Sequence, residues 1–309
     1  MTVSYLVTVY QKAKFLPTVL AAIAEERAAT GGEIIVIDDG STDGSGRILD
    51  DFAATGAGIT IVHQANAGVA AATNRALRTA REPFIRLIDG DDIITPNSTL
   101  VLLDALKRSG CGCVYGDSDE YDLGLTYRDL PRSDAGVYEI HPDRLAGMLR
   151  KQLFVVSVML GRRDVLQSAV PLPERYSHSQ DMSLGLKLAT ATGIAHVPAI
   201  CCYMASNAAL SGTDRLSGSM GRMYCDTTRI TQELFANWPL KYRGLAVRRC
   251  ALRALLYARR HIPHSRARCA ALLMIRCLGY LPLPALFPRF MDFVAETYAP
   301  ALRDPKSFP

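Results

Sequence analysis

Three carboxylates, Asp89, Asp91 and Asp92, stand within four positions directly after the apolar run at residues 85–88. The end of a strand holds its last side chains rigidly, and Gly90 permits a tight turn between them. Acidic groups this close repel one another unless a cation lies among them. Oxygen ligands favour a hard ion such as Mg²⁺ or Mn²⁺, whereas the alternative is an acidic turn on a solvated loop. The neighbouring segments decide between the two.

The elements that position these carboxylates alternate along the chain. Apolar, β-rich runs predict four strands with helical segments between them, so the sheet is expected to be mostly parallel. Ligands of such sheets bind beyond the carboxyl ends of the strands. The acidic turns at 38–43 and 89–92 both fall there, which predicts one site. The predicted strands are 3–10, 33–37, 59–62 and 84–88, and the predicted helices between them are 15–29, 48–54 and 69–79.

Beyond Asp92 the alternation is less regular. The patterns there predict helices at 98–109 and 181–190, and strands at 113–115, 155–160 and 200–204.

Charge divides the chain of 309 residues into two parts. From Lys241 onward it has 13 Lys and Arg against 3 Asp and Glu; the totals of 35 and 30 leave 22 against 27 before that point, so a net +10 follows a net −5. This break predicts one domain at 1–215, with halves at 1–110 and 111–215, and a basic helical region at 216–309.

The eight cysteines include no C-x-x-C pair, which argues against a zinc site. Cys250, Cys269 and Cys277 lie in apolar helical sequence, so we expect buried free thiols in a reducing cytoplasm. The first residues favour a strand over a secretion signal, and no apolar run is long enough to span a bilayer. We expect a cytoplasmic protein, with peripheral attachment to the inner face of the membrane as an option.

Four landmarks resemble the family 2 glycosyltransferases, which use nucleotide sugars and have the GT-A fold. They are the first strand ending in Val9-Tyr10, the turn from Ile37 to Asp43, the segment Asn66-Ala67-Gly68 with Asn74, and Asp89-Gly90-Asp91-Asp92. One departure is Thr73, which stands where Arg is common. The resemblance implies a Rossmann-like, mostly parallel sheet flanked by helices with a C-terminal helical extension. It also implies that residues 1–215 are the catalytic domain, with a nucleotide-sugar-binding half at 1–110 and an acceptor-binding half at 111–215.

The resemblance also implies a donor site. Asp39 would accept a hydrogen bond from the N3–H of a uracil, although an N-cap or Asx turn is the structural alternative, and Asp38 is expected to be structural. Asp89 would hold the ribose or a metal-bound water, and Asp91 the Mn²⁺ or Mg²⁺ ion on the diphosphate. The donor-binding residues implied are Val9, Tyr10, Asp38, Asp39, Gly68, Asn74, Asp89, Gly90 and Asp91, with Asp89 and Asp91 as metal ligands.

A general base is required because a sugar hydroxyl is a poor nucleophile. By resemblance it is Asp181, although an acid at the start of a helix also stabilises that helix. The family commonly carries an Arg and a His after this helix, but residues 203–207 contain neither, so the third metal ligand is open. Arg215 or Arg222 can clamp the diphosphate, or simply be solvated.

The basic region admits three interpretations. Positive helices beside short, Pro-broken apolar segments fit attachment to an anionic membrane leaflet, and equally a subdomain that packs on the catalytic domain. Nucleic acid is disfavoured, because the catalytic part is acidic and no aromatic stacking pattern accompanies the arginines.

These observations favour a metal-dependent transfer of a single sugar from a nucleotide diphosphate donor, preferably a UDP-sugar, and the resemblance implies that the transfer is inverting. The acceptor would be a hydroxyl of a glycan or a polyprenyl-lipid-linked glycan. Two alternatives are a sugar nucleotidyltransferase and an inactive nucleotide-sugar-binding module. The first would need a glycine-rich triphosphate loop near the first strand, and none accompanies Lys12 and Lys14.

Overall fold

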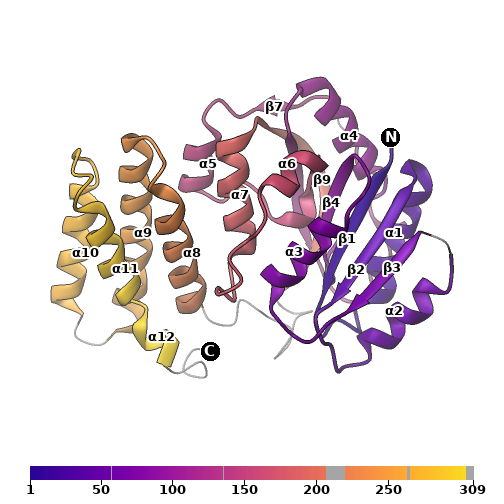
Figure 1. The fold of residues 1–309 in the computed structure, drawn as a ribbon, viewed down its shortest axis with the longest axis horizontal. Coiled ribbons are helices and arrows are strands. Elements are labelled where there is room, and N and C mark those ends of the chain that lie inside the picture. The colour runs from indigo at the N-terminus through magenta and orange to yellow at the C-terminus, as the bar shows by residue number, and fades with distance from the viewer. Residues whose placement is uncertain (57, 135, 207–219, 263–264, 304–309) are drawn as a thin grey trace. The chain divides into compact units, whose positions relative to one another are not determined.

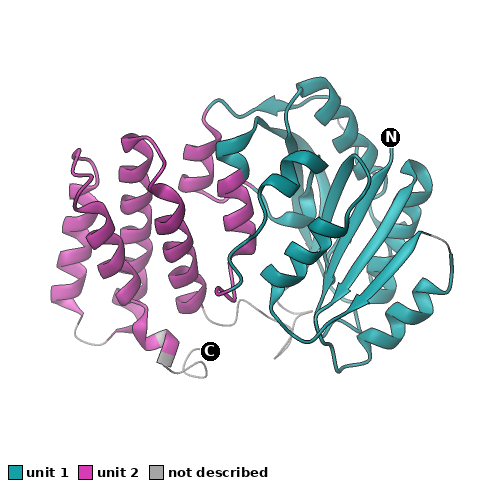
Figure 2. Ribbon diagram, in the orientation of Figure 1, with its two compact units in different colours: residues 1–142, 154–174, 188–215 teal, residues 143–153, 175–187, 216–309 magenta. Residues whose placement is uncertain are grey.

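The computed structural model describes residues 1–56, 58–134, 136–206, 220–262 and 265–303 (Figure 1). The chain divides into two compact units (Figure 2). Unit 1 comprises residues 1–142, 154–174 and 188–215, and unit 2 comprises residues 143–153, 175–187 and 216–309. Unit 2 thus takes in two segments from the predicted acceptor-binding half. The predicted functional domains stay a prediction.

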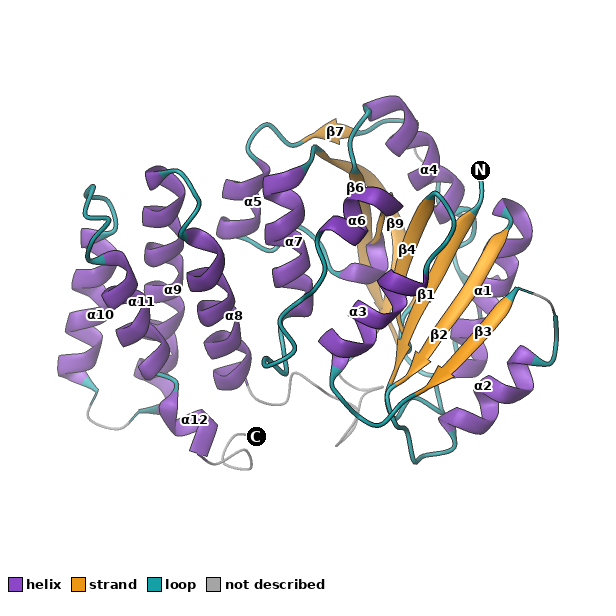
Figure 3. Ribbon diagram, in the orientation of Figure 1, coloured by secondary structure: helices purple, strands orange, loops and turns teal. Residues whose placement is uncertain are grey.

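Unit 1 is built on one mixed sheet that has helices on both faces (Figure 3). Its described strands run in the order β3-β2-β1-β4-β8-β6-β9-β5, with β7 paired to β9. The strands are β1 Val3–Val9, β2 Gly32–Asp38, β3 Ile59–His63, β4 Phe84–Asp89, β5 Ile93–Ile94, β6 Cys113–Tyr121, β7 Glu139–Ile140, β8 Met159–Arg162 and β9 Ile194–Ala205. The helices are α1 Leu16–Thr30, α2 Ser45–Ala53, α3 Val69–Thr79, α4 Ser98–Ser109 and α6 Arg163–Ser168, with 3₁₀ turns η1 Tyr127–Asp129 and η2 Val156–Val158.

The parallel part of the sheet, β1 to β4, confirms the predicted alternation. β1 is buried along nearly all its length, because helices cover both of its faces and neighbouring strands both of its edges. Its register pairs Val9 with Asp38 of β2 and Thr8 with Asp89 of β4. Both acidic turns therefore begin beside the carboxyl end of β1.

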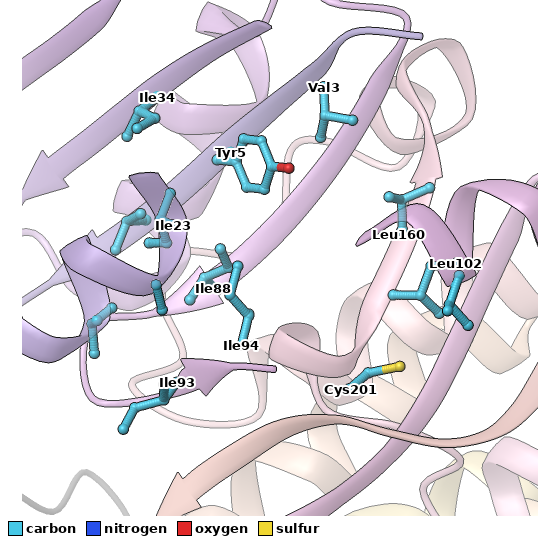
Figure 4. Packing of buried hydrophobic residues seen from close by; sticks show 14 of the residues in the cluster. Val3, Tyr5, Ile23, Ile34, Ile88, Ile93, Ile94, Leu102, Leu160 and Cys201 are labelled. Carbon is cyan, nitrogen blue, oxygen red and sulfur yellow. The ribbon is translucent and has the colours of Figure 1, made fainter. Parts of the chain in front are cut away.

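An apolar core lies beneath this sheet edge. Figure 4 shows Val3, Tyr5 and Ile34 from the strands, Ile23 from α1 and Leu102 from α4, and all five belong to one cluster of buried residues. Burial of a Leu or Ile side chain contributes about 1.5–3 kcal/mol relative to exposure. The same buried cluster reaches Val9 and Ile88, so the strands that carry the acidic turns are anchored along their length, up to the site.

Two predicted strands in the second half of unit 1 need correction. Residues 155–160 were expected to form one strand, but η2 occupies 156–158 and β8 runs from Met159 to Arg162. The chain turns at η2, where Ser157 Oγ accepts a hydrogen bond from the backbone N–H of Asp89 at 3.0 Å. The sequence does not reveal this turn, because an apolar run is buried whether the chain stays extended or turns. The strand expected at 200–204 is the end of the twelve-residue β9.

Unit 2 is helical. α9 packs against α5, α8, α10 and α11. Within the described residues, no helix has both the length and the apolar content needed to cross a bilayer. The helices are α5 Arg144–Arg150, α7 Gln180–Ala191 (its residues as far as Lys187), α8 Met220–Phe235, α9 Leu240–His261, α10 Arg266–Leu278, α11 Phe287–Glu296 and α12 Ala299–Arg303.

The cysteines are all free thiols, as expected, but not all are buried. Cys250 is buried on α9, whereas Cys269 is partly buried and Cys277 is exposed on α10. The expectation of burial was wrong for these two because α10 turns only one side, with Leu272 and Ile275, toward the other helices.

Candidate functional site

Asp89 and Asp91 lie at the carboxyl end of β4, each held by a neighbour. Thr8 Oγ1 donates to Asp89 Oδ1 at 3.2 Å. Lys12 Nζ donates to Asp91 Oδ2 at 2.6 Å, and the two side chains are only 12% and 16% exposed. The hydroxyl of Tyr121 donates to the backbone carbonyl of Asp91 at 2.7 Å. The two carboxylates thus have fixed positions in the described structure.

The two carboxylates are electrostatically coupled. Burial and, after it, the negative charge of Asp91 raise the pKa of Asp89 to about 6, although the Thr8 hydrogen bond and the Lys12 charge act against the rise. One ammonium group therefore does not compensate both acids. The environment favours an additional cation next to the pair.

The residues at this edge fit a divalent ion that is completed by substrate. The described residues contain no group of three or more His, Cys, Asp or Glu side chains arranged to hold a metal. Asp89 and Asp91 supply two carboxylates, and Asp92 is buried. Mg²⁺ characteristically takes one or two carboxylates and completes its shell with water and substrate phosphates. This donor set suits such an ion better than a permanent structural metal.

Gly90 lies against the end of β1. Its N–H donates to Thr8 O at 3.0 Å. A Cβ atom at Gly90 would stand 3.1 Å from that same oxygen and 3.1 Å from Val9 Cγ2. The absence of a side chain therefore lets the turn between the two carboxylates pack closely on β1.

Asp39 organises the loop that follows β3. Its Oδ1 accepts from the backbone N–H of Ala67 at 2.9 Å and from Gln64 Nε2 at 2.8 Å, and its Oδ2 accepts from the Gly68 N–H at 2.8 Å. Gly40 also approaches this loop, with φ +78° and a would-be Cβ 2.8 Å from Asn66 N. The structure thus adds a loop-anchoring function of Asp39 to the predicted contact with the base.

Asp38 is 3% exposed, and local partners occupy its carboxylate. It accepts from the Ser41 N–H at 3.0 Å and pairs with His63 Nδ1 at 2.8 Å. The hydrogen bonds from His63 to Asp38 and then to Asp50 raise the pKa of His63. These local partners suit a structural residue, and the function of Asp38 stays a prediction. Val9 is buried beside it, whereas Tyr10 is exposed at the site edge.

Backbone-to-side-chain bonds join the loops after β1 and β2 and position Lys12. The N–H groups of Gln11 and Lys12 donate to Ser41 Oγ and Ser45 Oγ, both at 3.0 Å. Asp43 Oδ2 accepts from Ala13 N–H at 2.9 Å. Lys12 was not predicted at this site. Its signal in the sequence is its place three residues after the end of β1, which is weak because a lysine in such a loop is ordinarily solvated.

Asn74 is fully buried on α3. Its side-chain oxygen accepts from the Leu172 N–H at 2.7 Å, and its nitrogen donates to Leu172 O at 2.9 Å and to Glu174 Oε1 at 2.8 Å. The amide therefore holds the segment at 172–174. Any effect of Asn74 on the donor site would be transmitted through that segment.

Asp181 lies in unit 2, in the first turn of α7. The segment before it is fastened to α8: His178 N–H donates to Asp226 Oδ2 at 3.0 Å, and Ser179 shares a 2.8 Å hydrogen bond with Thr227. Arg175 and Tyr176 both contact Glu233. Asp181 thus follows a segment that is hydrogen-bonded to α8, and its catalytic role stays a prediction.

One histidine and two arginines remain. His196 is on β9 and bonds Asp117 Oδ1 at 2.8 Å. Arg222 is on α8 in unit 2, and Arg215 lies outside the described residues. The third metal ligand stays open.

Comparisons with known proteins agree with this architecture. The profile of Glycosyl transferase family 2 matches residues 4–168, and the chain belongs to that family. Glycosyltransferase GlyG of Streptococcus pneumoniae is 33% identical over 121 residues, which is 39% of this chain and 40% of GlyG. The uncharacterized glycosyltransferase EpsJ of Bacillus subtilis is 31% identical over 122 residues, 38% of this chain and 35% of EpsJ. The matches thus span well under half of these relatives.

Solved structures share the GT-A fold. S. aureus TarS 1-349 in complex with UDP-GlcNAc superposes with a TM-score of 0.68 at 16% identity, covering 98% of this chain and 92% of that one. The mannosyltransferase PcManGT of Pyrobaculum calidifontis, in complex with GDP-Man and Mn2+, gives a TM-score of 0.57 at 16% identity, covering 99% and 88%. These likenesses confirm the predicted fold class.

Proposed function

We propose that the protein is a metal-dependent, inverting glycosyltransferase. It moves one sugar from a nucleotide diphosphate, with a UDP-sugar preferred, to a hydroxyl of a glycan or lipid-linked glycan. The observation that carries this proposal is the pair Asp89 and Asp91, held at the carboxyl end of β4 by Thr8 and Lys12. Family membership and the nucleotide-sugar complexes of TarS and PcManGT support it.

The donor would bind beyond the ends of β1, β2 and β4. Asp39 would accept from the base while it holds the loop of Ala67 and Gly68. Asp91 and Asp89 would hold Mn²⁺ or Mg²⁺, which neutralises the charge that develops on the departing diphosphate. Lys12 would add a second positive charge at the same edge.

On the acceptor side, Asp181 would take the proton of the attacking hydroxyl as the bond to the sugar forms. One base and one leaving-group site suit direct displacement, and therefore inversion. The bonds of residues 177–179 to α8 would fix the orientation of the base.

Calorimetry with UDP and with GDP, each with Mn²⁺ and with a chelator, tests the donor site. We expect metal-dependent binding of one nucleotide by the wild type, lost in Asp91→Asn and retained in Asp51→Asn, a control whose side chain is 77% exposed on α2. Binding of neither nucleotide under any metal condition would contradict the assignment. Asp181→Asn separates the transferase from an inactive binding module, because the transferase loses turnover and keeps its affinity for the donor.

A further inference from the structure

The helices α9 and α10 contain no Asp or Glu side chain, and their cations divide into two groups. Most are used inside unit 2. Arg249 Nη1 donates to Met148 O at 2.5 Å, Arg248 Nη1 donates to Gly279 O at 2.9 Å, and Arg253 lies over the ring of Tyr224. A helical subdomain whose arginines serve only its own packing would show this pattern throughout.

Arg259, Arg260 and Arg266 behave differently. All three are exposed, and none forms an ion pair with a residue that the structure describes. They line one cavity of about 560 Å³ where α9 ends and α10 begins, together with Ser265 and Cys269. Three guanidinium groups around one open cavity, with no nearby carboxylate on either helix, form a site for an anion.

An exposed apolar stripe, Leu273 and Met274, lies further along α10, the helix that begins at this cavity. Leu273 is 49% exposed and Met274 is 58% exposed, although Leu272 and Ile275 beside them are buried. Arg266 precedes Leu273 and Met274 by seven and eight residues, so all three lie on one side of the helix. Tyr280 and Leu281, 70% and 50% exposed, follow the helix end. Figure 1 shows the stripe's helix, α10, beside α9.

We propose that unit 2 docks on an anionic lipid bilayer, with the α10 stripe at the acyl boundary and a lipid phosphate between Arg259, Arg260 and Arg266. An apolar stripe beside a cluster of cations is typical of helices that lie in a membrane interface. A second copy of this chain complements the stripe less well, because its α9 and α10 offer no carboxylate to the arginines. The inference deepens the proposed function, since a lipid-linked acceptor is itself at the bilayer, but its test needs no turnover.

The test is co-sedimentation of the full chain with vesicles of phosphatidylcholine alone and of phosphatidylcholine mixed with phosphatidylglycerol. We expect binding only to the mixed vesicles. Replacement of Arg259, Arg260 and Arg266 by Gln should weaken it about 100-fold, or about fivefold for each arginine. The matched control replaces three exposed cations of unit 1, Arg47, Arg78 and Lys107, by Gln.

The apolar contribution is tested with Leu273→Ser plus Met274→Ser, which should weaken binding at least tenfold. Leu123→Ser plus Val137→Ser, at exposed positions of unit 1, is the control and should bind as the wild type does.

Three results would overturn the proposal. The first is equal binding to both vesicle types, or binding to neither. The second is an equal loss of binding in the two charge variants. The third is an unchanged vesicle affinity in the Leu273→Ser plus Met274→Ser variant together with a change from dimer to monomer in size-exclusion chromatography. The last result would make the stripe a contact between copies. Retained UDP or GDP binding shows independently that each variant is folded and that the donor site is intact.

Discussion

A buried ion pair beneath the site gives the sharpest prediction about stability. Glu26 of α1 is 3% exposed and Arg86 of β4 is fully buried, with Oε2 and Nη1 3.9 Å apart. Glu26 accepts from the N–H groups of Asn97 and Thr99 at 2.6 and 2.8 Å and from the Tyr127 hydroxyl at 2.9 Å. Glu26 therefore caps the N-terminus of α4 and also compensates the charge of Arg86.

The change Glu26→Gln keeps the shape and removes the charge. One of the two carboxylate oxygens becomes an NH₂ group, which faces an N–H donor of Asn97 or Thr99, and Arg86 is left as an uncompensated buried cation. Removal of one partner of a buried pair costs about 3–5 kcal/mol. The midpoint of thermal unfolding should fall by about 10 °C. Far-UV circular dichroism measures it, with Glu25→Gln, on the exposed side of the same helix, as the control.

A double-mutant cycle with Arg86→Met separates the pair from its hydrogen bonds. Arg86 also donates to Ser98 Oγ at 2.8 Å and to Cys201 O at 2.7 Å, so Arg86→Met is destabilising by itself. The double variant should be more stable than the sum of the single losses by at least about 1 kcal/mol. Additive losses, or a cost of Glu26→Gln below about 1 kcal/mol, would refute the reasoning.

Three further predictions concern the site and its supports. Lys12→Met should tighten Mn²⁺ binding several-fold, because it frees Asp91 Oδ2. Electron paramagnetic resonance measures this affinity, and Lys14→Met should leave it unchanged. Weaker Mn²⁺ binding by Lys12→Met would contradict the prediction. The raised pKa of His63 means that its pairs with carboxylates stabilise the fold below pH ~6.5 and lose that effect as the pH rises through the folded-state pKa. Because its side chain is 45% exposed, we expect a change of only ~0.5 kcal/mol, absent in His63→Gln. Asp226→Asn should lower kcat about tenfold with unchanged donor affinity; unchanged turnover would exclude a positioning function.

The parallel half of the sheet could be predicted from the sequence because its strands are continuous apolar runs with polar turns at their ends. The same reasoning found Asp89 and Asp91, since a carboxylate after a buried strand stands out. Lys12 could not be found this way, because a lysine in a loop after a strand is ordinarily solvated. Its backbone is held by the N–H groups of Gln11 and Lys12, which donate to Ser41 and Ser45 in the segment after β2, and no local pattern contains these bonds.

The second half of the chain shows a different limit. The apolar run at 155–160 has no period, so it could not reveal that η2 turns and supplies Ser157 to Asp89. The grouping of residues 143–153 and 175–187 with the C-terminal helices was likewise invisible. It arises from long-range side-chain contacts, such as that of His178 with Asp226, between segments 48 residues apart.

Adjacent residues of β1 hold both acidic turns of the site in place. Val9 O accepts from Asp39 N–H at 2.8 Å on one edge, and Thr8 O accepts from Gly90 N–H at 3.0 Å on the other. A slip of β1 by one residue would exchange which face each side chain occupies and break both bonds. The spacing between Asp39 and Asp91, which we propose to bind the base and the metal, is therefore set by the register of one buried strand. A donor would then encounter carboxylates that are already positioned and repel one another, so part of its binding energy would come from relieving that repulsion with a cation.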